Sequence, residues 1–155
     1  MNQLSEEASL YDRDYHLWVL ETVKHLETSD FEALDLENLI AEILGWAAMD
    51  KRELRNLLRL SFEHLLMWQY GEAERSNNYG HWRGEVTNFR KQIKDELEDS
   101  PSLKPYLQQI FEQCYQDGRE IASMRSQLPL ETFPEKAIAN LDQVLDENWF
   151  PRVSK

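Results

Sequence analysis

Apolar residues recur at three- and four-residue steps along most of this chain, the spacing that places side chains on one face of an α-helix. The first such segment runs roughly from Asp12 to Glu27, with Asp12 or Ser9 as cap and "TSD" (residues 28–30) as its break. Its predicted stripe is Tyr15, Trp18, Val19, Thr22, Val23 and Leu26. No segment of four or more residues alternates as a strand would. The pattern therefore predicts an all-α protein without a sheet.

The next two predicted helices are separated by a weak boundary. A second helix starts at Asp35, and a third runs from Lys51 to about Gly71. Gly45 and the capping-box variant "DKRE" at Asp50 favour a break between them, although one straight helix through both segments remains open. The buried stripe predicted for the second helix is Leu36, Leu39, Ile40, Ile43 and Leu44.

Residues 71–84, "GEAERSNNYGHWRG", hold three glycines and two asparagines, and this composition predicts an ordered loop. The fourth helix is expected directly after Gly84. The residues predicted to share its buried face are Val86, Phe89, Ile93 and Leu97.

The clearest boundary signal is "DSPSLKP", with Ser100 as cap and Pro101 at the first helical position. The fifth helix is predicted over about Pro101 to Ser126, with the apolar set Leu103, Leu107, Ile110, Phe111, Cys114, Ile121 and Met124. A loop over 128–134 follows, and a short helix from Pro134 or Asn140 to Asp146 precedes the aromatic tail "NWFP". We expect one domain over residues 1–155, a bundle of five to six helices with its core at about 10–151.

Cysteine usage and hydropathy indicate the compartment. The single cysteine, Cys114, excludes an intramolecular disulfide, and a thiol on an apolar stripe is expected to be buried and inert. The first ten residues, "MNQLSEEASL", are too polar and acidic for a targeting peptide, and no apolar stretch could span a bilayer. We therefore expect a soluble cytoplasmic protein without a membrane association.

The charge is strongly acidic but unevenly spread. A net charge of −12 opposes binding to nucleic acid, so a nucleic-acid partner is disfavoured without being excluded. Nine basic residues stand against five acidic ones between Lys51 and Lys94. Either this basic region pairs with acidic helices of the same bundle, or it forms an anion-binding or acidic-partner face.

His64 is the strongest candidate for chemistry. It falls on the flank of the third helix's apolar stripe, one turn before Trp68, where a partly buried imidazole usually packs and hydrogen-bonds. Arg59 stands five residues earlier, so "RLSFEH" resembles the R-x-x-x-x-H signature of HEPN-type ribonucleases. On a regular helix the two side chains lie about 140° apart and could converge only through long rotamers or across a dimer. The alternative function is accordingly an RNA-binding or phosphodiester-cleaving domain that uses Arg59 and His64.

No metal or cofactor is expected. None of the four histidines has Glu or Asp three residues earlier, the spacing that carboxylate-bridged sites in helical bundles use. The chain also lacks a phosphate-binding glycine loop, a nucleophile elbow and a dinucleotide fingerprint.

Aromatic and basic residues supply the binding candidates. Trp82 beside Arg83 is expected to pin the predicted loop or to form a recognition surface, and Arg90 and Lys94 are expected on the basic face of the fourth helix. The segment "GWAAM" (residues 45–49) and the aromatic tail are expected to be exposed and could form an interface.

Seven segments together resemble a bacterial, mainly cyanobacterial, family catalogued as "domain of unknown function 29". They are "LYDRDYHLW", "LDLENLIAEI", "RELRNLLRLSFEHLLMWQY", "HWRGEV", "DSPSLKPYL", "LPLETFPE" and "VLDENWFP", and they extend from about Leu10 to Pro151. The resemblance implies an all-α domain with no established activity or cofactor. The positions expected to be recurrent in the family are Glu37, Glu42, Arg55, His64, Trp68, Trp82 and Arg90.

The chain departs from the family pattern in two places. "LGWAAM" replaces a polar stretch after Glu42, and a Cys-Pro-Trp-like element is missing near residues 136–138. The leading hypothesis is a non-catalytic module that binds another macromolecule, a protein partner or a second copy, with Trp68, Trp82, Arg83, Arg90, Lys94, Glu42 and Arg55 as candidate contacts.

Overall fold

The computed structural model describes residues 8–153. Six α-helices and three short 3-10 turns account for the regular structure in this range, and no residue in it belongs to a strand. The all-α prediction and the number of helices are confirmed. The prediction that the first ten residues hold no targeting peptide falls largely outside the described range.

The contacts divide the chain into two compact units, the first ending at Ala48 and the second beginning at Met49. The expectation of a single domain over 1–155 stays a prediction. Each unit has its own packing, and helix α3 (Leu36–Tyr70) contributes residues to both.

The first unit contains α1 (Leu10–Arg13), α2 (Tyr15–Glu27) and the turn η1 (Phe31–Ala33). The predicted first helix is therefore interrupted at Asp14, whose Oδ1 accepts a hydrogen bond from the Leu17 amide at 2.9 Å and caps α2. Ser9 caps α1 in the same way through the Asp12 amide. Two local caps replace the single cap that we expected, because Asp14 is itself a strong capping residue.

Helix α3 is continuous over 35 residues, so the predicted break between Gly45 and Asp50 is wrong. It begins where expected, with the Asn38 amide donating to Asp35 Oδ1 at 3.4 Å. One glycine inside a helix costs only about 1 kcal/mol relative to alanine, and the helix formers on both sides outweigh that cost.

Helix α4 (Glu72–Asp99) starts immediately after α3, and the predicted loop over 71–84 is also wrong. Gly71 is the only residue between the two helices, and a Cβ there would lie 2.6 Å from the Met67 carbonyl oxygen. Arg75 donates to the Trp68 and Gln69 carbonyls at 3.0 and 2.7 Å, which satisfies the end of α3. These tertiary contacts outweigh the poor helix propensity of the segment.

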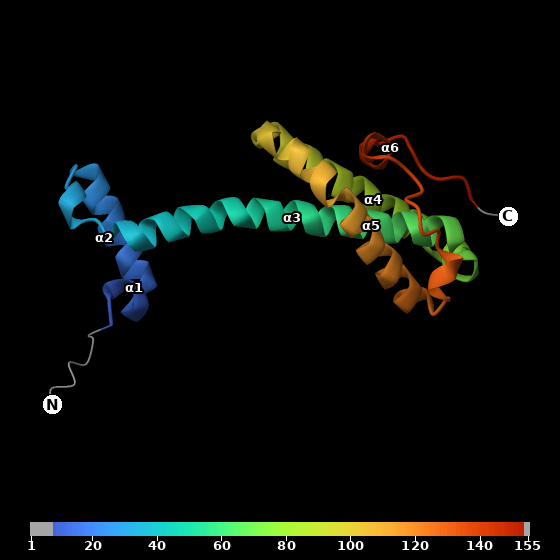
Figure 1. Cartoon of the computed structure of the whole chain (residues 1–155), viewed down its shortest axis with the longest axis horizontal. Coiled ribbons are helices and arrows are strands. Elements are labelled where there is room, and N and C mark those ends of the chain that lie inside the picture. Colours follow the sequence, from blue (N-terminus) through green and yellow to red (C-terminus); the bar gives the residue numbers. More distant parts are fainter. Residues whose placement is uncertain (1–7, 154–155) are drawn as a thin grey trace, which may run out of the picture. The chain divides into compact units, whose positions relative to one another are not determined.

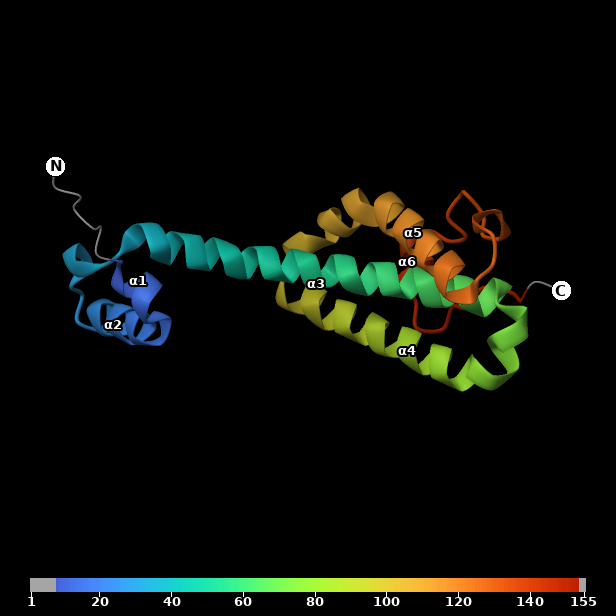
Figure 2. The same cartoon turned by 90° about the horizontal axis from the view of Figure 1, so that it is seen from below.

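The second half of α3 is the central helix of the second unit, with α4 and α5 (Lys104–Ser126) lying along it (Figure 1; Figure 2). Its buried side chains point in nearly every direction around the helix, as expected for a helix with neighbours on several sides. The buried residues of α3 are Leu54, Leu57, Leu58, Ser61, Phe62, Glu63, Leu65, Leu66 and Met67.

The remaining elements close the second unit. The turn η2 (Pro101–Leu103) precedes α5, so the predicted fifth helix begins as a 3-10 turn, and Ser100 makes no side-chain cap bond. After the turn η3 (Leu130–Thr132), helix α6 (Leu141–Leu145) begins at Asn140 with a full capping box to Gln143.

The buried faces of α4 and α5 were partly predicted. Val86, Phe89 and Ile93 are buried as expected, and Leu97 packs at the edge of the core. On α5, however, Met124 is 75% exposed. The buried set there is Leu107, Cys114, Tyr115, Gly118 and Ala122.

Candidate functional site

His64 is held by its own helix and by α4. Its Nδ1 lies 2.9 Å from the Leu60 carbonyl oxygen, and its ring meets the Phe89 ring edge-on at a centroid distance of 5.2 Å. A carbonyl oxygen can only accept, so Nδ1 carries the proton, and in the neutral ring Nε2 keeps a free lone pair. These contacts fit the packing interpretation of His64, and the free Nε2 leaves an acid–base group in place.

A polar cavity of about 240 Å³ adjoins His64. Glu63, only 2% exposed, lines it, and its Oε1 accepts a hydrogen bond from Arg125 Nη1 at 2.6 Å. Its Oε2 is buried without a hydrogen-bond partner among residues 8–153. Glu74 and His81 complete the titratable lining. The arginine that shares a cavity with His64 is thus Arg125, not Arg59.

Sequence reasoning missed Glu63 and Arg125. The available signal was the consecutive run Leu65, Leu66 and Met67, which cannot fit on one stripe and indicates a helix buried on several sides. A carboxylate beside such a run is expected to be buried and paired.

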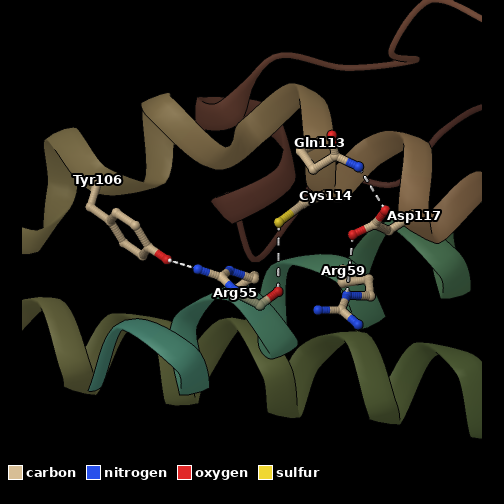
Figure 3. A network of polar contacts seen from close by, with 6 residues as sticks. All are labelled: Arg55, Arg59, Tyr106, Gln113, Cys114 and Asp117. Atoms are coloured by element: carbon tan, nitrogen blue, oxygen red, sulfur yellow. Dashed lines mark hydrogen bonds and ion pairs between the residues drawn. The ribbon is translucent and has the colours of Figure 1, made fainter. Parts of the chain in front are cut away.

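Arg59 belongs to a network between α3 and α5, which Figure 3 shows at close range. Its Nε lies 3.7 Å from Asp117 Oδ2, and Asp117 Oδ1 accepts a hydrogen bond from Gln113 at 2.9 Å. Arg59 therefore faces α5, whereas His64 packs against α4. Within one chain the two residues of the R-x-x-x-x-H pattern are not brought together.

Arg55 and Cys114 lie in the same network (Figure 3). Arg55 Nη2 donates to the Tyr106 hydroxyl at 3.0 Å, and the Cys114 thiol approaches the Arg55 carbonyl oxygen at 3.7 Å. Burial raises the pKa of Cys114 to about 11, against a smaller opposing effect of Arg59. The thiol is protonated near neutral pH, as its expected inertness requires.

Trp68 forms an aromatic cluster with the chain's tail. Its ring contacts the rings of Tyr79 and Phe150 at centroid distances of 4.3 and 4.8 Å. Arg83 and Arg90 also lie over Phe150, at 5.6 and 4.9 Å from the ring centroid. Trp149 and Phe150 pack against the core, so the prediction of an exposed aromatic tail is wrong.

Arg90 is buried, only 2% exposed, and the expectation that it lies on a basic surface is also wrong. Its Nε donates to the Val144 carbonyl and its Nη2 to the Trp149 carbonyl, both at 2.7 Å. These bonds hold α6 and the tail on α4. The sequence pattern could not reveal this role, because Arg90 stands among exposed basic residues.

The other candidates are distributed over both units. Trp82 is buried within α4, and it lines the polar cavity. Lys94 is exposed, further along the same helix. In the first unit, Glu42 accepts hydrogen bonds from the hydroxyls of Tyr11 and Tyr15. The hydrogen bond to Glu42 is the main cause that raises the pKa of Tyr11 to about 12.

The apolar stripes of the first unit are largely uncovered. Among the predicted members of the α2 stripe only Trp18 and Thr22 are buried. On α3, Trp46 is 58% exposed, which confirms the expectation for the "GWAAM" segment. Ile40 is 55% exposed, so the predicted burial of the stripe that contains it is wrong. The other exposed large apolar residues of this unit are Tyr15, Leu17, Leu20, Val23, Leu26, Phe31, Leu36, Ile43 and Leu44.

Two features are absent from the described part of the chain. Residues 8–153 contain no group of three or more His, Cys, Asp or Glu side chains placed to hold a metal ion. None of the helices in that range combines the length and the apolar character needed to cross a membrane.

Comparison with known proteins gives one match. The family described as "Domain of unknown function DUF29" matches residues 10–150, nearly the whole chain. Neither the curated proteins nor the solved structures include a match. Because this match covers nearly the whole chain, the chain is a member of the DUF29 family.

Proposed function

We propose that this chain is a non-catalytic protein-interaction module, and that its contact surface is the apolar face of the first part of α3. The partner to which this surface is best suited is a second copy of the chain. The observation that carries the proposal is the half-exposed stripe of Leu36, Ile40 and Ile43. An apolar stripe of this length is typical of an interaction site.

The bare stripe is the continuation of a buried one. Leu54, Leu57 and Ser61 recur on α3 at steps of three and four residues, and all three are buried in the second unit. Read toward the start of the helix, the same spacing passes through the charged residue Asp50 and then reaches Ala47, Ile43, Ile40 and Leu36, all of which are exposed. The apolar positions before Asp50 therefore form an exposed seam of heptad type, and those after it are buried.

The exposed area is sufficient for a dimer. Leu36, Ile40, Ile43, Leu44 and Trp46 are between 49% and 65% exposed. At roughly 190 Å² for a fully exposed side chain of this size, they offer about 540 Å² per copy, or about 1,100 Å² in a pair, which exceeds the minimum of about 1,000 Å² for a biological interface. The exposed residues of α2 add to this area.

The charges on this part of α3 suit an antiparallel pair. Glu37 near its start and Lys51 fourteen residues later are both exposed and lie on the same flank of the seam. When two copies of 36–51 lie antiparallel with Leu44 opposite Leu44, Glu37 of each copy lies opposite Lys51 of the other, and Asp50 is one residue away from that pair. In a parallel pair this flank would face the opposite flank of the partner, and Glu37 and Lys51 would not meet.

The double variant Ile40→Gln/Ile43→Gln tests the proposal by sedimentation velocity. We expect the wild type to sediment as a dimer at about 50 μM, and the variant as a monomer, with its dissociation constant raised about a thousandfold or more. Met124→Gln, which changes an even more exposed apolar residue of α5, should leave the dimer intact. Circular dichroism should show equal helix content in all three proteins.

Charge exchange provides a sharper test of the antiparallel arrangement. Glu37→Lys and Lys51→Glu should each weaken the dimer, and the double variant should restore it, because the interface pair is then re-formed with opposite polarity. Lys51 also lies 5.2 Å from the Tyr106 ring centroid, so the restoration by the double variant is the decisive result. A wild type that stays monomeric at about 1 mM would rule out the proposal.

Catalysis by Arg59 and His64 has less support, because Arg59 is paired with Asp117 and His64 with Leu60 and Phe89. The hypothesis of a basic RNA-binding face on α4 also has less support, because Arg90 is buried beneath the tail. Cytoplasmic location remains an expectation from the sequence.

A further inference from the structure

A second cavity, of about 420 Å³, lies in the second unit beside Arg90. Ile93, Leu97 and Leu145 give it an apolar wall, and Lys94 and Lys104 contribute positive charge. None of these residues belongs to the α3 surface proposed above, so the two sites can be tested separately.

The guanidinium of Arg90 is a buried charge without a carboxylate partner. Its two hydrogen bonds go to main-chain carbonyls, and Nη1 is buried with no hydrogen-bond partner within residues 8–153. No carboxylate of the described residues lies within ion-pairing distance of it. A buried charge that lacks a counter-charge is costly, so a structure that keeps one usually compensates it by other means.

The pKa of Arg90 reflects this environment. Burial lowers it to about 10, and Asp146 and Glu147 oppose the effect only in part. The group therefore stays protonated near neutral pH, and its positive charge acts on whatever fills the cavity that Arg90 lines.

The cavity as a whole is also positive. Arg90, Lys94 and Lys104 stand against the two carboxylates of Glu98 and Glu147. Glu147 is further engaged by Lys91 at 3.8 Å. One additional negative charge in the cavity would bring the sum of the charges on its lining residues to zero.

We propose that this cavity binds a small molecule that carries one carboxylate on an apolar body. The carboxylate lies toward Arg90 and the two lysines, where its charge completes the balance, and the apolar body lies against Leu97 and Leu145. The volume falls within the range of small-molecule sites, whose walls are mostly apolar with a few polar groups that fix orientation.

Hexanoate and 1-hexanol form a matched pair of probes for the full-length protein, because they share the apolar chain and differ in charge. Hexanoate should produce saturable shifts in the amide resonances of residues around Arg90, Leu97 and Leu145 in ¹H–¹⁵N correlation spectra. 1-Hexanol and acetate should produce none at the same concentration. Equal binding of 1-hexanol, or shifts scattered over the whole chain, would overturn the proposal.

Substitutions of the two lysines test the charge contribution without disturbing the core. Lys94→Gln and Lys104→Gln should each weaken hexanoate binding about fivefold, and Lys94→Glu more strongly. Lys136→Gln, which removes an exposed lysine outside the cavity, should bind as the wild type does. Unchanged affinity in both cavity variants would contradict the assignment, whatever the oligomeric state of the protein.

Discussion

Close contact between α5 and α3 depends on a single residue, Gly118. A Cβ at this position would lie 2.8 Å from the Phe62 Cβ and 3.0 Å from the Arg59 carbonyl oxygen. These distances are shorter than van der Waals contact, and the atoms belong to the main chain of α3 or to its first side-chain carbon. The helices would have to separate to admit a methyl group.

We therefore expect Gly118→Ala to lower the free energy of unfolding by about 1–3 kcal/mol in urea denaturation, through overpacking. Gly84→Ala is the matched control. A Cβ there meets nothing within 4 Å, so alanine should raise the free energy of unfolding by about 0.5–1 kcal/mol. Stabilisation by both substitutions would show that α5 does not approach α3 this closely.

Residue types alone could not separate the two roles that arginine plays here. Arg83 and Arg90 are on the same helix and both lie over Phe150, yet only Arg90 is buried. The difference comes from the carbonyls of Val144 and Trp149, more than fifty residues away in the sequence, which replace water around Arg90.

At the scale of the elements, continuity of α3 is the main departure from the local signals. Gly45 and the Asp50 capping candidate both favour an end to the helix. Each contributes at most about 1 kcal/mol, whereas hydrogen bonding and propensity over the remaining residues act together along the whole helix.

Gly45→Ala tests this continuity. A Cβ at Gly45 meets nothing within 4 Å, and the position faces away from the seam. In a continuous helix, alanine should stabilise the segment by about 0.5–1 kcal/mol, which slows amide hydrogen exchange around residues 44–49 about two- to fivefold. Exchange at an unchanged rate would indicate that the helix is interrupted there.

Helices with strong end signals were predicted well. Asn140, one of the two expected starts of the last helix, caps α6 together with Gln143, and α3 and α5 end within a residue of the expected positions, at Tyr70 and Ser126. The start of α4 was missed because its first turns are stabilised by tertiary contacts such as Trp68 with Tyr79, which sequence propensity does not include.

At the scale of the whole molecule, the excess of acidic residues leaves local clusters of like charge. Glu96 on α4 is the clearest case. Burial is the largest cause that raises its pKa. The negative charges nearby raise the pKa further, and they belong to Asp50, Asp99, Glu53 and Asp95. Folding therefore disfavours the charged form of this carboxyl group.

The stability that corresponds to a raised carboxyl pKa is present below the unfolded-state value and is lost as the pH rises through the folded-state value. At pH 7 the charge of Glu96 is thus unfavourable to the folded state. We expect Glu96→Gln to raise the Tm at pH 7, and the difference to disappear below about pH 4, where the unfolded-state carboxyl is also protonated. Glu120→Gln, at an exposed position of α5, serves as the control and should show no such pH-dependent gain.

Local signals were sufficient to predict the helical class, several helix ends and the spacing of apolar residues along the helices, because these depend on local hydrogen bonding and on spacing along one helix. Which apolar stripes are covered depends on the tertiary structure. It buried Glu63 and Arg90, left Ile40 and Trp46 exposed, and directed Arg59 and His64 toward different helices. Burial depends on which helices become neighbours, and those contacts join residues that are far apart in the chain.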